Sequence, residues 1–205
     1  MRMKKNAGER TLLTSVILSA PGPIVVGIGL FLGRSSTQYA DFVRRTAELA
    51  AIIVSLLVYR ALHKTGAVDE SRARRLEGMA NTFVGGAMCL SGVVMAFLAL
   101  FSAAGQKGNV IPGLVIALLG VTANTWFWLR YRKLSRDGKS AILTAQSRLY
   151  RAKALVDGCV TIALSAVALA PLSQAARYTD LGGSLMVAVY LVYSGVSVLR
   201  EIKTK

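Results

Sequence analysis

The chain is dominated by long runs of residues that carry no charged side chain. Five such runs are 19 to 29 residues long, and a helix needs roughly 20 apolar residues to cross the hydrocarbon core of a bilayer. Runs of this length predict an all-α polytopic membrane protein. The five runs are Thr11–Gly33, Gly78–Gln106, Val110–Leu129, Gly158–Ala176 and Leu181–Leu199.

A sixth span is expected between Gln38 and Leu62, although only its second half, Leu49–Tyr59, is free of charge. We therefore predict six transmembrane helices. The first is expected to stay uncleaved, because its apolar stretch is longer than the core of a signal peptide. Pro21 and Pro23 are expected to kink it, since proline removes a backbone donor.

The composition agrees with a membrane protein and argues against other classes. The chain is 54% hydrophobic and 17% charged, whereas soluble domains carry about 25% charged residues. The net charge of +15 does not indicate nucleic-acid binding, because the basic residues lie between the apolar runs and not on a polar fold. The two cysteines, Cys89 and Cys159, lie inside apolar segments and form no disulfide framework or zinc-finger spacing.

The distribution of Lys and Arg predicts the orientation. Basic residues are concentrated before span one, after spans two and four, and after span six, while the opposite side carries only Arg34, Lys107 and Arg177. By the positive-inside rule we expect both termini to face the cytoplasm. The expected location is the cell's inner (plasma) membrane, where anionic lipid at the cytoplasmic face is the expected partner. The expected domains are a basic tail (1–10), the six-helix domain (11–199) and a short tail (200–205), with no cytoplasmic C-terminal domain.

Ionisable residues inside the expected spans are costly unless they are paired or wetted. Two pairs stand out, Arg44 with Glu48 and Lys153 with Asp157, because residues four apart share one face of a helix. If spans two and five face each other, these four charges sum to zero in one cluster. The cluster is either a transport site that contacts substrate or protons, or a salt-bridge network that only fixes helix packing.

Other charged residues are secondary candidates. Glu77 opens span three and Asp180 opens span six, while Asp41 lies near Arg44 as an entrance carboxylate or an arginine partner. The only histidine, His63, is interpreted as an interfacial residue, because a lone His lacks partners at ligand spacing. Aromatic residues at the end of span four are expected to be interfacial anchors. They are Trp126, Trp128 and Tyr131.

The order of these features resembles the six-helix transmembrane part of the cation diffusion facilitator family. The stretch Ala40–Glu48 resembles the family's second-helix motif, with Ala-Asp followed by ligand positions three and seven residues after the Asp. The segment Arg75-Leu76-Glu77 resembles the opening of its third helix. Lys153-x-x-x-Asp157 with Thr161, and Asp180 with Tyr190–Ser194, resemble its fifth and sixth helices.

The resemblance implies a homodimeric cation transporter, with a divalent-metal site at the positions of Arg44, Glu48, Lys153 and Asp157. The two acids remain acidic here, but Arg44 and Lys153 are cationic. A guanidinium has no lone pair for a metal, so no zinc is expected at this site, and no other metal ligand set or cofactor is predicted.

Two functions follow as alternatives. In the first, the protein transports a cation, coupled to protons, through Glu48 and Asp157, with Arg44 and Lys153 as internal cations. In the second, the same fold is a structural or regulatory membrane subunit held together by the salt-bridge network. An enzyme is not expected, since the sequence contains no phosphate-binding Gly loop, nucleophile elbow or Cys/His cluster.

Overall fold

A computed structural model gives the architecture, and it describes residues 2–32, 36–64, 69–101, 111–138, 140–169 and 174–203. Within these ranges the chain is helical except at single residues between helices, and it contains no strand. The described residues form seven helices in succession. They are α1 (Arg2–Ser19), α2 (Pro21–Leu32), α3 (Ser36–Lys64), α4 (Glu70–Phe101), α5 (Ile111–Gly138), α6 (Ala141–Leu169) and α7 (Gln174–Lys203).

The helix of the first span is interrupted at Ala20, next to the prolines that were predicted to kink it. Helix α1 ends at Ser19, Ala20 donates its N–H to the carbonyl of Val16 at 2.9 Å, and α2 begins at Pro21. Proline is tolerated at the first position of a helix, where its missing N–H is not needed. The two helices together provide one apolar stretch, Ala7–Ile28, of membrane-spanning length.

Four stretches in the described residues are long and apolar enough to cross a membrane, and they lie in α1–α2, α4, α5 and α7. Helices α3 and α6 are not among them, and these two carry Arg44, Glu48, Lys153 and Asp157. The all-α membrane fold is confirmed, whereas the count of six spans stays a prediction.

The described helices do not begin and end with the predicted segments at two places. The apolar run Gly158–Ala176 is not one helix, because α6 ends at Leu169 and α7 already begins at Gln174. At the other end of the chain, the basic segment 1–10 is helical from Arg2 onward and forms the start of α1.

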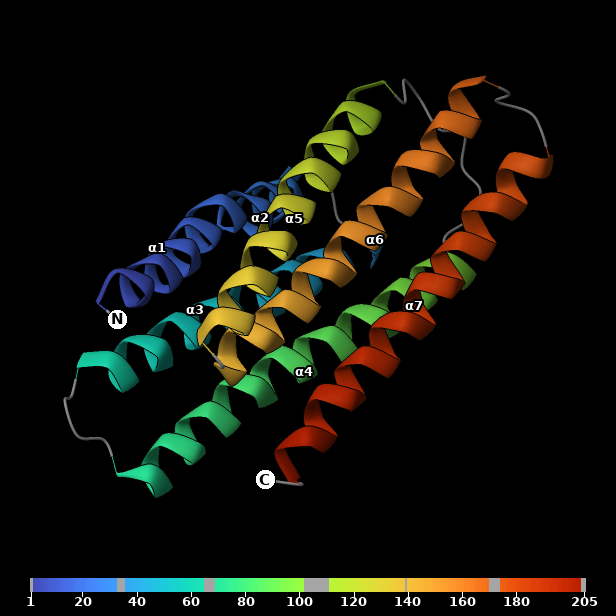
Figure 1. Ribbon diagram of the computed structural model, residues 1–205. Helices are drawn as coiled ribbons and strands as arrows, with labels where there is room; N and C mark the ends of the chain where they lie inside the picture. Colours follow the sequence, from blue (N-terminus) through green and yellow to red (C-terminus); the bar gives the residue numbers. More distant parts are fainter. Residues whose placement is uncertain are drawn as a thin grey trace.

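The helices pack as two close antiparallel pairs, α4 with α7 and α5 with α6, while α1 and α2 lie against α3 (Figure 1). The start of α1 and the end of α7 lie at the same end of the molecule, which we call the basic end (Figure 1). Tyr131 on α5 and Tyr150 on α6 are almost fully buried, with ring centroids 5.3 Å apart, and their hydroxyls reach side chains of α1. Many large apolar side chains point outward, as lipid contact requires. Examples are Ile17, Leu18, Phe101, Ile116, Leu119 and Val189.

Glycines allow α4 and α7 to approach closely. A Cβ atom at Gly92 would lie 2.8 Å from the carbonyl oxygen of Ala188, and one at Gly195 would lie 2.7 Å from the carbonyl oxygen of Gly85. Side chains larger than hydrogen do not fit at such distances. Small residues at a helix interface are the usual basis of close packing in membranes.

Tyr131 corrects one sequence prediction. It was expected at the lipid interface, but its side chain is fully buried and its hydroxyl lies 2.8 Å from the hydroxyl of Ser15 on α1. Trp126 is about half exposed, at 48%, and agrees with an anchor.

Candidate charged site inside the helix bundle

The carboxylate of Glu48 is the centre of the candidate site. Glu48 lies in the middle of α3 and is only 5% exposed. A buried carboxylate requires charged or hydrogen-bonding partners to offset its lost hydration. Three side chains, from three helices, provide them.

Two of these partners are cations. The Arg44 guanidinium lies one turn earlier in α3, with Nη1 3.6 Å from Oε1 of Glu48. The Lys153 ammonium reaches across from α6, with Nζ 3.3 Å from Oε2 of Glu48. Both cationic side chains are themselves largely buried, at 13% and 17% exposed. Glu48 therefore joins α3 to α6 through charge.

The third partner is a hydroxyl on α4. Ser91 is 1% exposed and donates its hydroxyl hydrogen to Oε1 of Glu48 at 2.8 Å. Sequence analysis did not single out Ser91 as a partner of Glu48. A polar atom in an apolar run was the available signal, because a buried hydroxyl needs a partner.

Asp157 has a different environment from Glu48. Its Oδ2 accepts a hydrogen bond of 2.6 Å from the Asn124 side-chain amide on α5. Within the described part of the chain, no Lys or Arg nitrogen lies within 4 Å of its carboxylate. Lys153, Arg44 and Glu48 are still near enough to interact with it through their charges.

Gly120 makes room for the Asp157 carboxylate against α5. A Cβ atom at position 120 would lie 2.6 Å from Oδ2 of Asp157. The amide of Asn124 follows one turn later on the same helix, so α5 presents a notch and a donor side by side. Sequence analysis missed both residues. Asn124 was detectable as an amide within the uncharged run Val110–Leu129.

The structure thus brings Arg44, Glu48 and Lys153 into direct contact and places Asp157 beside them. The Lys153–Asp157 spacing did not yield an ion pair within α6, because Lys153 points to Glu48 on α3. The four formal charges sum to zero. The cations of this cluster are two side chains of the protein itself, Arg44 and Lys153. Of its two carboxylates, that of Asp157 has the fewer partners.

The secondary candidates lie elsewhere or outside the described side chains. Glu77 lines a cavity of about 240 Å³ with Asn81 and Arg148, and it is fourteen residues from Ser91 on α4, about 21 Å along the helix. The backbones of Asp41 and Asp180 belong to α3 and α7, but their side chains are outside the described part of the structure. His63 stacks on Tyr59 with ring centroids 4.2 Å apart.

The donor set does not match a zinc site. Among the described residues, no three His, Cys, Asp or Glu side chains are grouped as metal ligands. Two carboxylates face two cations, and neither a guanidinium nor an ammonium offers a lone pair. Zinc sites are usually tetrahedral with lone-pair donors.

Comparison with known protein families identifies the chain's family. The family model of the cation efflux transmembrane domain matches residues 12–203. No curated protein sequence shows significant similarity to the chain.

Proposed function

The chain belongs to the cation efflux family, and we propose on that basis that it moves a monovalent cation, in exchange for protons, through the site formed by Glu48 and Asp157. Family membership and the apolar helices make it a multi-pass membrane protein of the cation diffusion facilitator kind. The substrate, the proton coupling and the site are our proposal.

The carboxylate of Asp157 is the observation that carries the proposal. It lies inside the helix bundle with one hydrogen-bond donor, Asn124, and no cation of the described residues within 4 Å. A carboxylate in such a place has capacity to accept a proton or a cation. Intramembrane carboxylates are the usual elements of ion pathways and proton relays.

The charge balance of the site favours a monovalent substrate. At an effective dielectric constant of 20, a unit charge 4 Å from another is repelled by about 4 kcal/mol, and a divalent ion by about twice that. Arg44 and Lys153 are both present, so a divalent ion meets this repulsion from two sides. A monovalent cation displaces Lys153 from Glu48 at lower cost.

Transport by purified protein in proteoliposomes tests the proposal. We expect flux of Na⁺ or K⁺ that depends on a pH gradient, weak or absent flux of Zn²⁺, and loss of flux in Asp157→Asn. The matched control is Asp69→Asn, a change of the same chemistry at an exposed residue before α4, which should transport normally. Equal loss in both variants, or flux retained in Asp157→Asn, contradicts the assignment of the site.

A second function is favoured by the environment of Glu48. Its carboxylate is fully engaged by Arg44, Lys153 and Ser91, as expected of a network that only fixes helix packing. A structural or regulatory membrane subunit would show no flux of any cation. It would nevertheless be destabilised by loss of Lys153.

We further propose that both termini face the cytoplasm of the inner membrane, that the protein is a homodimer, and that it catalyses no reaction. Its expected partners are anionic lipids and a second copy of itself, without nucleic acid. Lys107, in the loop expected outside, lies beyond the described residues. A cysteine introduced at that position should react with an impermeant reagent in intact cells, and reaction only after permeabilisation refutes the orientation. Cross-linking in membranes tests the dimer.

A further inference from the structure

A second polar feature lies near the basic end, separate from the charged site. Helices α5 and α6 enclose a cavity of about 430 Å³, open to the surface. Cavities of this size are large enough for a small ligand. It is lined by Trp128, Arg132, Ser135, Thr144, Ser147, Arg148 and Arg151.

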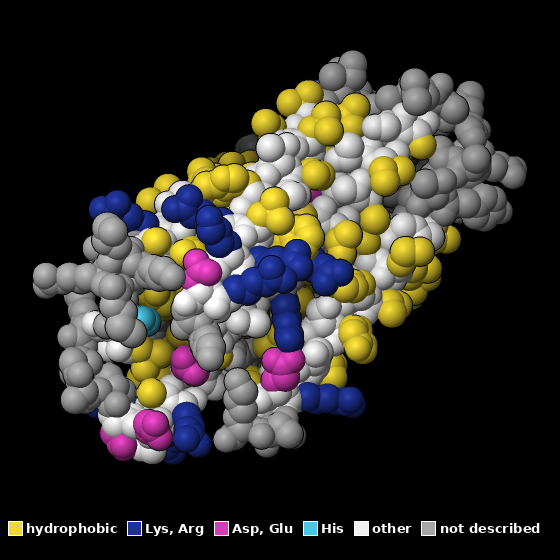
Figure 2. Space-filling view, in the orientation of Figure 1, with side chains coloured by type: hydrophobic (Ala, Val, Ile, Leu, Met, Phe, Trp, Pro, Cys, Tyr) yellow, Lys and Arg dark blue, Asp and Glu magenta, His cyan; other side chains and the backbone are white. Residues whose placement is uncertain are grey.

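The lining of this cavity is positively charged and contains no carboxylate. Arg148 is partly neutralised, because it donates to Oε1 of Glu201 at 2.7 Å. Arg132 and Arg151 have no Asp or Glu oxygen within 4 Å among the described side chains. Figure 2 shows Lys and Arg side chains crossing this face over α5 and α6. Among the described residues, the cavity thus presents two arginines with no acidic partner and one with a partner.

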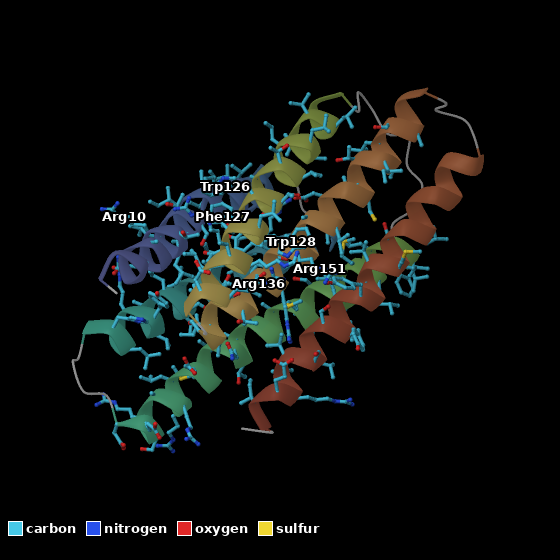
Figure 3. All side chains as sticks on the ribbon, in the orientation of Figure 1. Arg10, Trp126, Phe127, Trp128, Arg136 and Arg151 are labelled. Atoms are coloured by element: carbon cyan, nitrogen blue, oxygen red, sulfur yellow. The ribbon has the colours of Figure 1, made fainter. Side chains whose placement is uncertain are left out.

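Arg151 is held in position by aromatic rings. Its guanidinium lies 5.8 Å from the ring centroid of Trp128 on α5 and 5.7 Å from that of Tyr190 on α7. Figure 3 shows Arg151 and Trp128 next to each other from the two helices. A guanidinium stacked in this way keeps its N–H donors free, and such donors match the oxygens of a phosphate.

Apolar surface lies on the side of the arginines away from the basic end. Leu129 is three residues before Arg132 on α5, and Leu155 is four residues after Arg151 on α6, so each lies about one turn deeper. The two leucines are 51% and 43% exposed. A soluble phosphate would gain nothing from them, whereas a molecule with a phosphate head and acyl chains would contact both.

We propose that the cavity between α5 and α6 binds the phosphate headgroup of an anionic phospholipid, with Arg132 and Arg151 contacting the phosphate oxygens and the acyl chains running along Leu129 and Leu155. Basic pockets between transmembrane helices are known to suit such headgroups. Because α6 carries Arg151 as well as Lys153, a bound lipid fixes the helix that also supplies the charged site. The lipid assignment does not depend on the proposed transport function.

Lipid binding to the full-length protein in a neutral detergent tests the proposal. The retained lipid is measured by native mass spectrometry during titration with phosphatidylglycerol, with phosphatidylcholine as the zwitterionic comparison. We expect one phosphatidylglycerol to bind preferentially. Arg132→Gln/Arg151→Gln should weaken its binding about 30-fold, since each of the two basic residues contributes about one kcal/mol near a lipid headgroup.

The matched control removes the same charge elsewhere. Arg72 and Arg75 are exposed on α4 and line neither this cavity nor the neighbouring one, so Arg72→Gln/Arg75→Gln should bind phosphatidylglycerol as the wild type does. Equal weakening in both double variants would mean diffuse attraction by net charge and overturns the site. Equal binding of phosphatidylcholine by the wild type overturns it as well.

One further variant and one competition experiment complete the test. Ser135→Glu places a carboxylate in the cavity lining without removing an arginine, and it should weaken phosphatidylglycerol binding even if the double arginine variant does not fold. Unchanged binding in a folded Ser135→Glu protein contradicts the proposal. Inorganic phosphate in large excess should not displace the lipid, and displacement by phosphate alone would reassign the cavity to a soluble anion.

Discussion

The ammonium nitrogen of Lys153 lies 3.3 Å from a carboxylate oxygen of Glu48, so a charge on α6 neutralises a charge on α3. Both side chains are largely buried, at 17% and 7% exposed. Removing one member of a buried ion pair leaves the other charge without compensation, which costs far more than losing an exposed pair. The pair therefore links the stability of the bundle to the residues of the candidate site.

The first prediction is a double-mutant cycle on this pair. Lys153→Met should lower the free energy of unfolding by about 3 kcal/mol, because among the described residues Glu48 is then left with Arg44 as its one cationic partner. Glu48→Gln should also destabilise, since two buried cations then lose their shared anion. The double variant should cost less than the sum of the singles, by about 1–3 kcal/mol. Unfolding in mixed micelles with increasing denaturing detergent measures all four proteins.

The exposed pair Arg74–Glu70 is the control for this cycle. It has the same i,i+4 spacing as Arg44–Glu48 with the acid and base in reverse order, its atoms are 3.5 Å apart, and its side chains are 69% and 90% exposed. Glu70→Gln should leave the stability unchanged, because water screens such pairs. Strict additivity at Glu48 and Lys153 would show that the two charges do not interact in the folded protein.

The second prediction concerns the notch at Gly120. Gly120→Ala should lower the free energy of unfolding by about 1–3 kcal/mol, because the added methyl group displaces the Asp157 carboxylate from Asn124. The same substitution in an Asp157→Ala background should be neutral or stabilising, since the obstacle is gone and alanine is the better helix former. The same destabilisation in both backgrounds would place the clash elsewhere.

These two predictions also show how far the sequence leads. Intramembrane charge at i,i+4 spacing directed attention to Arg44, Glu48 and Lys153, which the structure brings into contact. The proline pair predicted a kink at the place where α1 gives way to α2. The partners Ser91 and Asn124 were missed, because hydropathy treats an isolated polar residue in an apolar run as tolerable. Which cation meets Glu48 depends on the relative rotation of α3 and α6, and spacing within one helix contains no information about that rotation.

The third prediction compares two glycines of α4. Gly92→Ala should destabilise the protein by about 1–3 kcal/mol, because a methyl group there lies 2.8 Å from the carbonyl oxygen of Ala188 on α7. Gly86→Ala should be neutral or slightly stabilising, since nothing lies within 4 Å of its added Cβ atom and glycine is a poor helix former. Thermal denaturation in detergent compares the two. A destabilising Gly86→Ala with a harmless Gly92→Ala would reverse the assignment of the faces of α4.

The fourth prediction concerns zinc. The wild-type protein should bind Zn²⁺ weakly between α3 and α6, because the two cations repel it and add no lone pair to Glu48 and Asp157. Replacing Arg44 with Asp and Lys153 with His supplies both missing ligands and removes both positive charges. Arg44 and Lys153 both point toward Glu48, so the shorter Asp and His side chains should project toward the same carboxylate. We expect affinity to rise by about 100-fold or more, measured by calorimetry.

A third protein separates ligand number from charge in this experiment. Arg44→Gln/Lys153→Met removes the two positive charges but restores no His or carboxylate ligand, so it should gain much less affinity than Arg44→Asp/Lys153→His. Equal gains in the two variants would show that repulsion alone excludes zinc from the wild type. Tight, stoichiometric zinc in the wild-type protein at this site would mean that Arg44 and Lys153 do not occupy the ligand positions of the family. A folded Arg44→Asp/Lys153→His protein without zinc would show that the four positions do not converge on one ion, because carboxylate and imidazole ligands need atomic distances of about 2 Å from the metal.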